Sequence, residues 1–351
     1  MTDTTDTKPS ADIEDGVSAI LSLIDQERER EIIVRRFGLY DRRETLEQIG
    51  ELLGITRERV RQLEKAILTR LKKTAEEGRT DTVAKLEKTF IRSLSEMGRA
   101  ARVADLADAV YGKSTNAKER AHVAFVATLA PHLTVLDEND HYHQSVAMAD
   151  YGSEKDFKAR IDEIVTLIKT AKEPQTVTQL YDKLNYENPQ QVAALASLSK
   201  QLAHLRDMWG LVKWPTVNPK NIRDKIYVIL ADNKKPMHFS EISKAIKDSS
   251  FKRKNVTTQA IHNELIKDKR FVLIGRGIYA LDSWGYSKGT VSDIIADILR
   301  NAKEPLHRDE IVKLVLSTRQ VKETTILLNL QSKPQFKRVA KATYTLVDKE
   351  S

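Results

Sequence analysis

Two short amphipathic segments meet at a single glycine, and this arrangement constrains the chain more than any other feature. The first segment, residues 45–55, carries apolar residues at three- and four-residue spacing: Leu46, Ile49, Leu52 and Leu53. Gly54 follows, and glycine readily takes the left-handed conformation that ends helices. The second segment, residues 56–71, has an apolar face at Val60, Leu63, Ile67 and Leu71. With Thr45 and Thr56 as N-caps, the pattern predicts a helix-turn-helix.

The polar face of the second predicted helix holds a side chain for each common contact in the DNA major groove. Its members are Arg57, Glu58, Arg61, Gln62 and Lys65. An arginine can bind a guanine edge and a glutamine an adenine edge, while a glutamate can accept from cytosine. The remaining basic residues suit phosphates, which give affinity without reading sequence. The alternative is a solvated surface, since many helices alternate Arg and Glu for i,i+4 pairing.

The stretch from Glu27 to Lys73 resembles region 4 of the sigma-70 family. It is similar to that family's REREV-like helix, its RFGL stretch, its TLEEIG helix and its TRERVRQIE recognition helix, over about one seventh of the chain. In the family this domain binds the −35 promoter element and docks on the flap of the RNA polymerase β subunit. The resemblance therefore implies double-stranded promoter DNA and the polymerase core as partners.

Three sets of site residues follow from this resemblance. Residues expected to read bases are Arg57, Glu58 and Gln62. Residues expected to lie near DNA phosphates are Thr45, Thr56, Arg59, Arg61 and Lys65. Residues expected at the polymerase flap are Arg35, Arg36 and Phe37.

Composition agrees with a nucleic-acid partner. The 351 residues carry a formal net charge of +8, and a basic balance favours DNA or RNA among partners. The chain has no cysteine, which excludes disulfides and cysteine-ligated zinc and fits a reducing compartment. No apolar run reaches the length of a membrane span, and the N-terminus is not a signal peptide. We expect a soluble, cytoplasmic protein at the bacterial nucleoid.

After about residue 82 the chain repeats itself. PMHFSEI, residues 236–242, aligns with PLHRDEI, residues 305–311, and apolar residues lie six and ten positions after each proline. The same offsets follow Pro174 and Ala100. Each copy adds a third helix and strand-like segments, which predicts four tandem winged helices of three helices plus a β-hairpin. The fold class is therefore mainly α.

The sequence indicates both strands of the hairpin more clearly in the last two copies than in the first two. The third copy turns at Gly275-Arg276-Gly277, and the fourth pairs 336–339 with 343–347. The second copy shows one strand-like run at 209–214, and the first pairs 133–136 with Tyr142 across a polar turn.

These patterns set the expected domain boundaries. They are a disordered acidic N-terminus at 1–14, the region 4-like domain at 15–76, and winged helices at 83–148, 156–216, 220–284 and 289–348. Residues 74–82 read as a helix end and a hinge. Polar linkers, as at 151–155, predict that the copies fold independently. His238 and His307 recur at equivalent places, which favours packing or capping over catalysis.

The third copy, residues 226–246 with 270–281, resembles the HARE-HTH winged helix, a family that includes a domain of the polymerase δ subunit. The fourth copy matches it more weakly. Members are mostly thought to bind DNA or polymerase, and the basic residues suggested for secondary DNA contacts are Lys252, Arg253, Lys254 and Arg276. Basic residues also mark the fourth wing, whereas the acidic turn at 137–140 would repel phosphate. The alternative is a set of protein-interaction modules or a spacer array.

No motif in the chain predicts catalysis. There is no P-loop, no GxGxxG after a strand, no cysteine nucleophile and no HExxH. His141 and His143 are the closest histidine pair, but two ligands make a poor metal site. We expect no cofactor, metal or small-molecule substrate. The leading hypothesis is a sigma-like DNA-binding factor in transcription initiation. The alternatives are an antagonist or scaffold that occupies the flap without reading DNA, and a specificity chain of a restriction or repair system.

The scarcity of aromatic residues leads to a first prediction. Promoter opening requires capture of unstacked bases on aromatic side chains, and only 6% of this chain is aromatic, mostly at hairpin positions. We therefore expect core polymerase with this chain alone to bind promoter duplex and leave it closed. Permanganate reactivity of thymines around the start site measures opening. Strong reactivity without another sigma factor would contradict the expectation.

Overall fold

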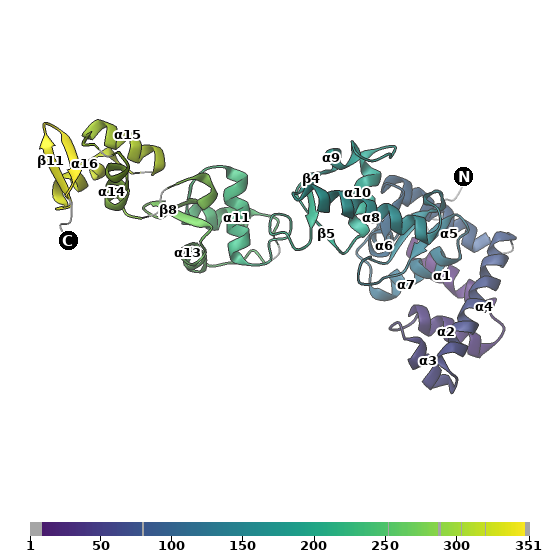
Figure 1. The fold of residues 1–351 in the computed structure, drawn as a ribbon. Coiled ribbons are helices and arrows are strands. Elements are labelled where there is room, and N and C mark those ends of the chain that lie inside the picture. Colours follow the sequence, from purple (N-terminus) through teal and green to yellow (C-terminus); the bar gives the residue numbers. More distant parts are fainter. Residues whose placement is uncertain are drawn as a thin grey trace, which may run out of the picture. The chain divides into compact units, whose positions relative to one another are not determined.

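The computed structural model describes residues 9–78, 81–251, 253–286, 289–302, 304–319 and 321–347. They form two compact parts, an N-terminal part that ends at Lys213 and a C-terminal part that begins at Trp214. Both parts are mainly helical (Figure 1). None of the helices in these ranges combines the length and hydropathy that a membrane span requires.

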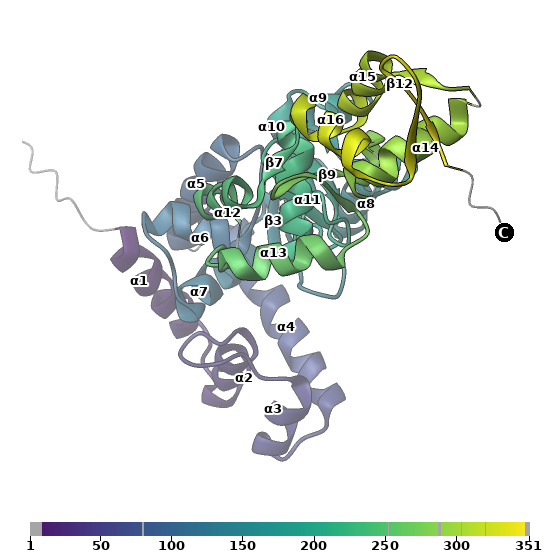
Figure 2. The same cartoon turned by 90° about the vertical axis from the view of Figure 1, so that its left-hand side faces the viewer.

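Four helices open the N-terminal part. They are α1 (Pro9–Ser22), α2 (Glu27–Phe37), α3 (Leu46–Leu53) and α4 (Arg57–Glu76). The expectation of a disordered segment through residue 14 is wrong for residues 9–14, which are helical, while residues 1–8 lie outside the described ranges. Ile13 is only 1% exposed because α1 packs on α5 and α7 (Figure 2). That packing is long-range, so the local composition did not reveal it.

Four repeats follow, each with the same order of elements: a helix, a short strand, two helices and a β-hairpin. The first holds α5 (Asp81–Glu96), β1 (Ala100–Arg102), α6 (Val103–Tyr111), α7 (Ala117–Leu129), β2 (Leu133–Leu136) and β3 (Ser145–Met148). The second, after a 3-10 turn (Ala149–Tyr151), holds α8 (Glu154–Ala171), β4 (Gln175–Thr176), α9 (Val177–Tyr181), α10 (Pro189–Leu198), β5 (Leu202–Leu205) and β6 (Met208–Leu211).

The third and fourth repeats make up most of the C-terminal part. The third holds α11 (Ile222–Asn233), β7 (Met237–His238), α12 (Phe239–Asp248), α13 (Thr258–Lys267), β8 (Phe271–Gly275) and β9 (Ile278–Leu281), followed by a 3-10 turn (Asp282–Trp284). The fourth holds α14 (Val291–Ala302), β10 (Leu306–His307), α15 (Arg308–Thr318), α16 (Glu323–Ser332), β11 (Phe336–Ala340) and β12 (Thr343–Leu346).

The strand order of the sheet is the same in all four repeats. The orders are β1-β3-β2, β4-β6-β5, β7-β9-β8 and β10-β12-β11, with every pair antiparallel. The last strand of each repeat therefore lies in the middle of its sheet. The first strand is only two or three residues long, too short to show an alternating pattern, and it was not predicted.

The hairpins of the last two repeats lie where the sequence predicted them. The turn between β8 and β9 uses Gly277 at φ +70°, a conformation that favours glycine. The first two hairpins correct the prediction. The partner of β2 is β3 and not Tyr142, whose hydroxyl instead donates to the Asp162 carboxylate at 2.6 Å in the second repeat. In the second repeat β6 ends at Leu211, short of the predicted 214, and pairs with an unpredicted β5.

The recurring histidines cap helices, as their repeat positions indicated. Nδ1 of His238 accepts from the backbone N–H of Ser240 at 3.3 Å, and Nδ1 of His307 does the same for Asp309 at 3.3 Å. Glu241 completes a capping box by accepting from the His238 N–H at 3.0 Å. Both histidines thus stabilise the start of the second helix of their repeat.

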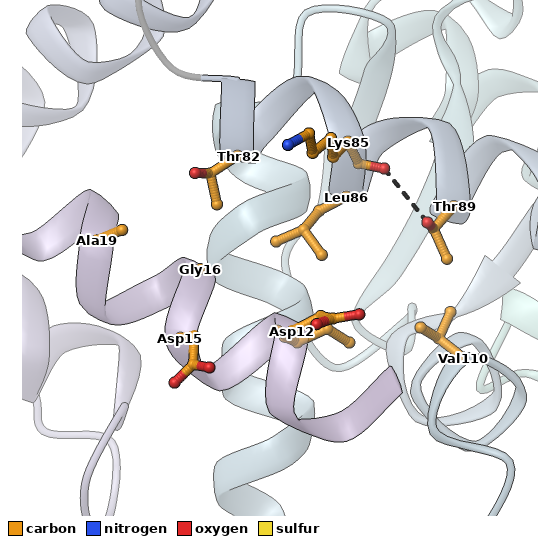
Figure 3. Close-up of a pocket in the computed structure, with 10 residues that line it drawn as sticks. Asp12, Asp15, Gly16, Ala19, Thr82, Lys85, Leu86, Thr89 and Val110 are labelled. Carbon is orange, nitrogen blue, oxygen red and sulfur yellow. Dashed lines mark hydrogen bonds between the residues drawn. The ribbon is translucent and has the colours of Figure 1, made fainter. Parts of the chain in front are cut away.

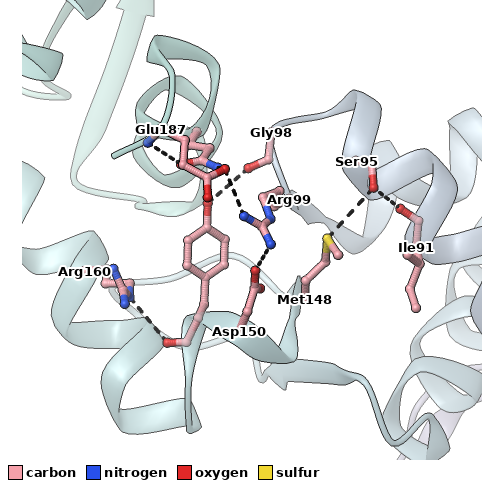
Figure 4. A network of polar contacts seen from close by, with 10 residues as sticks. Ile91, Ser95, Gly98, Arg99, Met148, Asp150, Arg160 and Glu187 are labelled. Carbon is pink, nitrogen blue, oxygen red and sulfur yellow. Dashed lines mark hydrogen bonds and ion pairs between the residues drawn. The ribbon is translucent and has the colours of Figure 1, made fainter. Parts of the chain in front are cut away.

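The first and second repeats do not fold as separate bodies, which corrects the expectation of a polar linker between them. Tyr151, in the expected linker, is buried and its hydroxyl donates to the Gly98 carbonyl at 3.2 Å. Arg99 pairs with Asp150 and, at 3.1 Å, with Glu187 of the second repeat (Figure 4). A Cβ on Gly98, which sits at φ +84°, would lie 2.6 Å from the Gln190 carbonyl oxygen. The close approach of the two repeats therefore requires glycine at position 98.

The first repeat also shares one hydrophobic core with the region 4-like helices. Phe37 at the end of α2 packs edge-on against Phe125 of α7, with ring centroids 5.1 Å apart. Ile67 and Leu71 of α4 belong to the same buried cluster. Most of α7 is enclosed by these contacts, and its buried residues are His122, Val123, Ala124, Phe125, Val126, Ala127 and Leu129. The two domains predicted from sequence are therefore one packing unit.

His122 provides the polar contact in this shared core. It is 2% exposed, and its Nε2–H donates to the Leu39 carbonyl at 2.8 Å. Its Nδ1 is also buried and has no hydrogen-bond partner among the described atoms. Burial is the main cause that lowers the pKa of His122, and the Leu39 carbonyl opposes it. The imidazole is therefore held neutral where the two domains meet.

The division into two parts predicts how fragments behave. A fragment of residues 214–351 has its own cores and should be soluble and melt cooperatively in circular dichroism. The matched control is residues 83–148, the first repeat alone, which would expose the apolar surface it shares with α1, α2 and α4. We expect this control to aggregate or stay unfolded. Aggregation of 214–351, or cooperative folding of 83–148, would contradict the division.

His122 also predicts a dependence of stability on pH. Its folded-state pKa lies below the ordinary value of 6.5, so the unfolded chain binds more protons. This contribution to stability is complete above about 6.5 and is lost as the pH falls below it. The melting temperature of the full chain should therefore drop between pH 7.5 and 5.5, and by less in His122→Asn. Burial also lowers the pKa of His143, so this residue should account for part of the pH dependence that remains in His122→Asn. An unchanged pH response in His122→Asn would refute the assignment.

Candidate nucleic-acid interface

Both helices of the helix-turn-helix begin at the predicted caps. The Thr45 hydroxyl accepts from the Gln48 N–H at 3.3 Å, and the Gln48 side chain accepts from the Thr45 N–H at 2.9 Å. Thr56 caps α4 by accepting from the Arg59 N–H at 3.2 Å. Gly54 lies between them at φ +64° and ends α3. Three residues close together in the sequence, Thr45, Gly54 and Thr56, therefore set where the two helices begin and where the turn lies.

A small core holds the two helices at a fixed angle. Ile32, Ile49 and Val60 are fully buried, and Leu46, Leu53, Ile55 and Leu63 pack around them. Leu52 is a correction to the predicted apolar face, because its side chain is 54% exposed. Gly50 was missed: a Cβ there would lie 2.7 Å from the Ile55 carbonyl oxygen, so the turn requires glycine at this position too. The sequence does show a glycine inside a regular helical pattern, which can indicate close packing of another backbone segment.

The predicted base-reading residues lie together on the exposed face of α4. Arg57 reaches back to Glu47 of α3 at 3.1 Å. Glu58 accepts from Arg61 at 2.7 and 2.8 Å and from the Gln62 amide at 3.3 Å. All five side chains are solvent-exposed. Glu47 was not predicted, because only the tertiary structure brings it beside the start of α4.

The charges in this network are set by close ion pairs. The hydrogen bond from Arg61 lowers the pKa of Glu58 to about 2, and Glu58 in turn raises the pKa of Arg61. Glu58 is therefore ionised at neutral pH and can only accept hydrogen bonds. A carboxylate acceptor suits the amino group of cytosine in the major groove.

The predicted phosphate contacts surround this face. Thr45 and Thr56 are exposed at the starts of α3 and α4, although each hydroxyl already accepts a capping bond. Arg59 lies in the first turn of α4 and donates weakly to Gln62 at 3.5 Å. Lys65 extends the exposed basic face toward the middle of the 20-residue helix. The arrangement places positive charge next to the candidate base-reading residues on α4.

The residues expected at the polymerase flap form the last turn of α2 and make contacts within the chain. Arg35 pairs with Glu31 and Glu44, each at 2.9 Å. Arg36 pairs with Glu64 at 3.1 Å, and Phe37 packs on Phe125. Both arginines are half-buried. These consecutive residues contact different partners within the chain, and their contact with a polymerase stays a prediction.

The suggested secondary DNA residues belong to the C-terminal part. Arg253, Lys254 and Arg276 are exposed there, around the third helix and hairpin of the third repeat. Lys252 lies outside the described residues. These three side chains therefore belong to a different compact part of the chain from α4.

The described residues offer little for a small ligand or metal. A pocket of about 460 Å³ lies between α1 and α5, where Gly16 approaches Leu86 (Figure 3). Its charged lining residues, Asp12, Asp15 and Lys85, are all exposed to solvent. Within the described ranges no three His, Asp or Glu side chains gather as metal ligands. Neither feature competes with α4 as the candidate site.

Comparison with known proteins agrees with the geometry of this region. The family model for sigma-70, region 4 matches residues 26–73. The chain is 41% identical to the RNA polymerase sigma factor RpoS of Coxiella burnetii over 64 residues, 18% of each protein. It is 48% identical to the sigma factor RpoD of Helicobacter pylori over 63 residues, 17% of this chain and 9% of the relative.

A cyanobacterial relative covers a similar share. The sigma factor SigA1 of Synechococcus elongatus is 41% identical over 61 residues, 17% of this chain and 15% of the relative. The chain thus spans less than a fifth of each of these relatives. Residues 26–73 form a sigma-70 region 4 domain.

Proposed function

We propose that this chain is a sigma-like transcription factor that binds promoter DNA through residues 26–73 and acts with RNA polymerase in initiation. The observation that carries the proposal is the exposed face of α4, where base-reading side chains and phosphate-binding cations lie on one capped helix. Because the helix-turn-helix core is buried and the face is solvated, the helix is presented ready for a major groove. A −35-type element is the proposed target, by resemblance to sigma region 4.

DNA binding would exchange the ion pairs of this face for contacts with bases. Arg57 would leave Glu47 for a guanine edge, and an exposed ion pair of this kind stabilises by only about 0–1 kcal/mol. Arg61 would leave Glu58 for a phosphate, which frees the Glu58 carboxylate to accept from cytosine. Gln62 would then bind an adenine edge. The pairs seen without DNA hold these side chains near their working positions.

RNA polymerase core is the proposed protein partner, with the β flap contacting the side that carries Arg35 and Arg36. Phe37 packs on Phe125, so only the part of its ring that stays exposed could touch the β flap. The rival function is an antagonist that occupies the flap without reading DNA. A footprint with and without polymerase distinguishes the two, since only the first protects a defined sequence.

The four repeats are proposed to be winged helices, the last two related to HARE-HTH domains. Their common strand order and their hairpins support this assignment. We propose that they add polymerase or DNA contacts, and that the chain is not an enzyme and needs no cofactor. The proposed place of action is the nucleoid in the bacterial cytoplasm.

Substitution of Arg57 tests base reading by α4. Arg57→Ala should weaken binding to duplexes selected from a randomised pool by about 1–3 kcal/mol and relax the preference at one base position. Lys73→Ala, at the far end of the same helix, is the matched control and should leave the sequence preference unchanged. Affinities on selected and random duplexes are measured at one salt concentration. Equal losses on both kinds of duplex in Arg57→Ala would refute base reading.

A further inference from the structure

A pocket of about 360 Å³ lies where α1, α6 and α7 meet. It differs from the pocket between α1 and α5, because two of its lining side chains, Tyr111 and His122, are polar and buried. Oη of Tyr111 and Nδ1 of His122 have no hydrogen-bond partner among the described residues. A buried polar atom that stays unpaired costs stability, so two of them in one pocket point to a ligand that pairs them.

We propose that this pocket binds a free α-amino acid. The ammonium group of the ligand would donate to Nδ1 of His122, and its carboxylate would accept from the Tyr111 hydroxyl. This site goes beyond the function proposed for the chain and uses none of the side chains proposed to contact DNA or polymerase. Binding involves no reaction, so the amino acid is neither a substrate nor a cofactor.

The surroundings of each buried atom set its role in hydrogen bonding. His122 is neutral and its Nε2–H donates to the Leu39 carbonyl at 2.8 Å, so its Nδ1 carries a lone pair and can only accept. Burial raises the pKa of Tyr111 to about 12, so its hydroxyl keeps its proton at neutral pH and can donate. An α-amino acid carries the complementary donor and acceptor on adjacent carbon atoms.

Four charged side chains surround these two buried residues, and their charges balance. Lys113 pairs with Glu119 at 2.7 Å, and Lys118 pairs with Glu14. The side chains of Lys113 and Glu14 are each 56% exposed, so these ion pairs can open at little cost in free energy. Two charges of each sign suit a zwitterion, because a ligand with charge of one sign would be repelled by either the lysines or the glutamates.

The four charges lie close enough to the buried residues to act on them. Burial has the largest effect on the pKa of both Tyr111 and His122, and Glu14 and Glu119 act to raise both pKa values. Nζ of Lys113 lies 5.9 Å from the centroid of the Tyr111 ring. A ligand that touches the two buried residues therefore also reaches carboxylate and ammonium groups, and both of its charged ends gain charge-assisted hydrogen bonds.

The pocket joins elements that lie far apart in the sequence. Glu14 belongs to α1, Tyr111 to α6 and His122 to α7, while the Leu39 carbonyl that holds His122 belongs to the region 4 domain. The unfolded chain does not bring these groups together, so the ligand binds the folded state selectively. The amino acid should therefore stabilise the N-terminal part, and the melting temperature should rise with its concentration.

Calorimetric titration of the full chain with each proteinogenic L-amino acid in turn tests the proposal. We expect at least one of them to bind and to raise the melting temperature. Its N-acetyl derivative lacks the ammonium group and its methyl ester lacks the carboxylate, so neither derivative should bind. The absence of binding by every amino acid would overturn the proposal. Equal binding of either derivative would overturn the assignment of a zwitterion.

Substitutions of the two buried residues test the assigned contacts with the amino acid that binds. Tyr111→Phe removes only the hydroxyl and should weaken binding by roughly 10- to 100-fold. His122→Gln keeps an N–H that can donate to Leu39 but lacks the acceptor at Nδ1, so it should also weaken binding. Tyr279→Phe is the matched control, because it removes the hydroxyl of a buried tyrosine in the C-terminal part and should leave the affinity unchanged.

A surface variant keeps the test valid if the buried variants do not fold. Lys118→Met changes a side chain that is 39% exposed and should weaken binding, because one cation that would face the ligand carboxylate is lost. Melting curves without ligand check that each variant is folded. Unchanged affinity in folded Tyr111→Phe would overturn the proposal, and if that variant is unfolded, unchanged affinity in Lys118→Met would do so.

Discussion

The packing of Phe37 on Phe125 is the contact on which the N-terminal part depends. Without the larger core to which this contact belongs, the region 4 domain would rest on three fully buried residues, Ile32, Ile49 and Val60. Domains of about 50 residues bury too little surface to be more than marginally stable. Burying one phenylalanine contributes about 1.5–3 kcal/mol, so the shared core supplies a large share of the stability that holds α4 in position.

This arrangement explains why similar repeats take different roles. The third helix of the first repeat is used to support the region 4 domain, and that of the second is used to dock on the first. Helices enclosed in this way have no face left for a groove. In the third repeat the third helix, α13, keeps Gln259 and Asn263 exposed to solvent. Packing therefore leaves different faces of the third helix open in different repeats.

The exposed network on α4 illustrates a different use of weak interactions. Ion pairs such as Arg57 with Glu47 contribute little to stability in water, yet they keep long side chains extended along one face. Replacing such exposed pairs with other partners would cost little free energy. Strong buried pairs would have locked the same side chains away from the bases.

The local sequence by itself determined where elements begin and end. Thr45, Gly54 and Thr56 specify the helix-turn-helix, and the turn at 275–277 specifies a hairpin, because caps and turns depend on neighbouring residues. The exposed polar face of α4, with Arg57, Glu58 and Gln62 on it, could likewise be predicted from the helical period.

Only the tertiary structure decided which surfaces remain available. It packed Phe37 against α7 in one core, exposed Leu52, formed a helix from residues 9–14 and joined the first two repeats through Gly98. Periodicity shows that one face of a helix is apolar, but it does not show which element packs on that face, because that element can lie far away in the sequence. Those long-range contacts decide which third helix is buried and which is exposed to solvent.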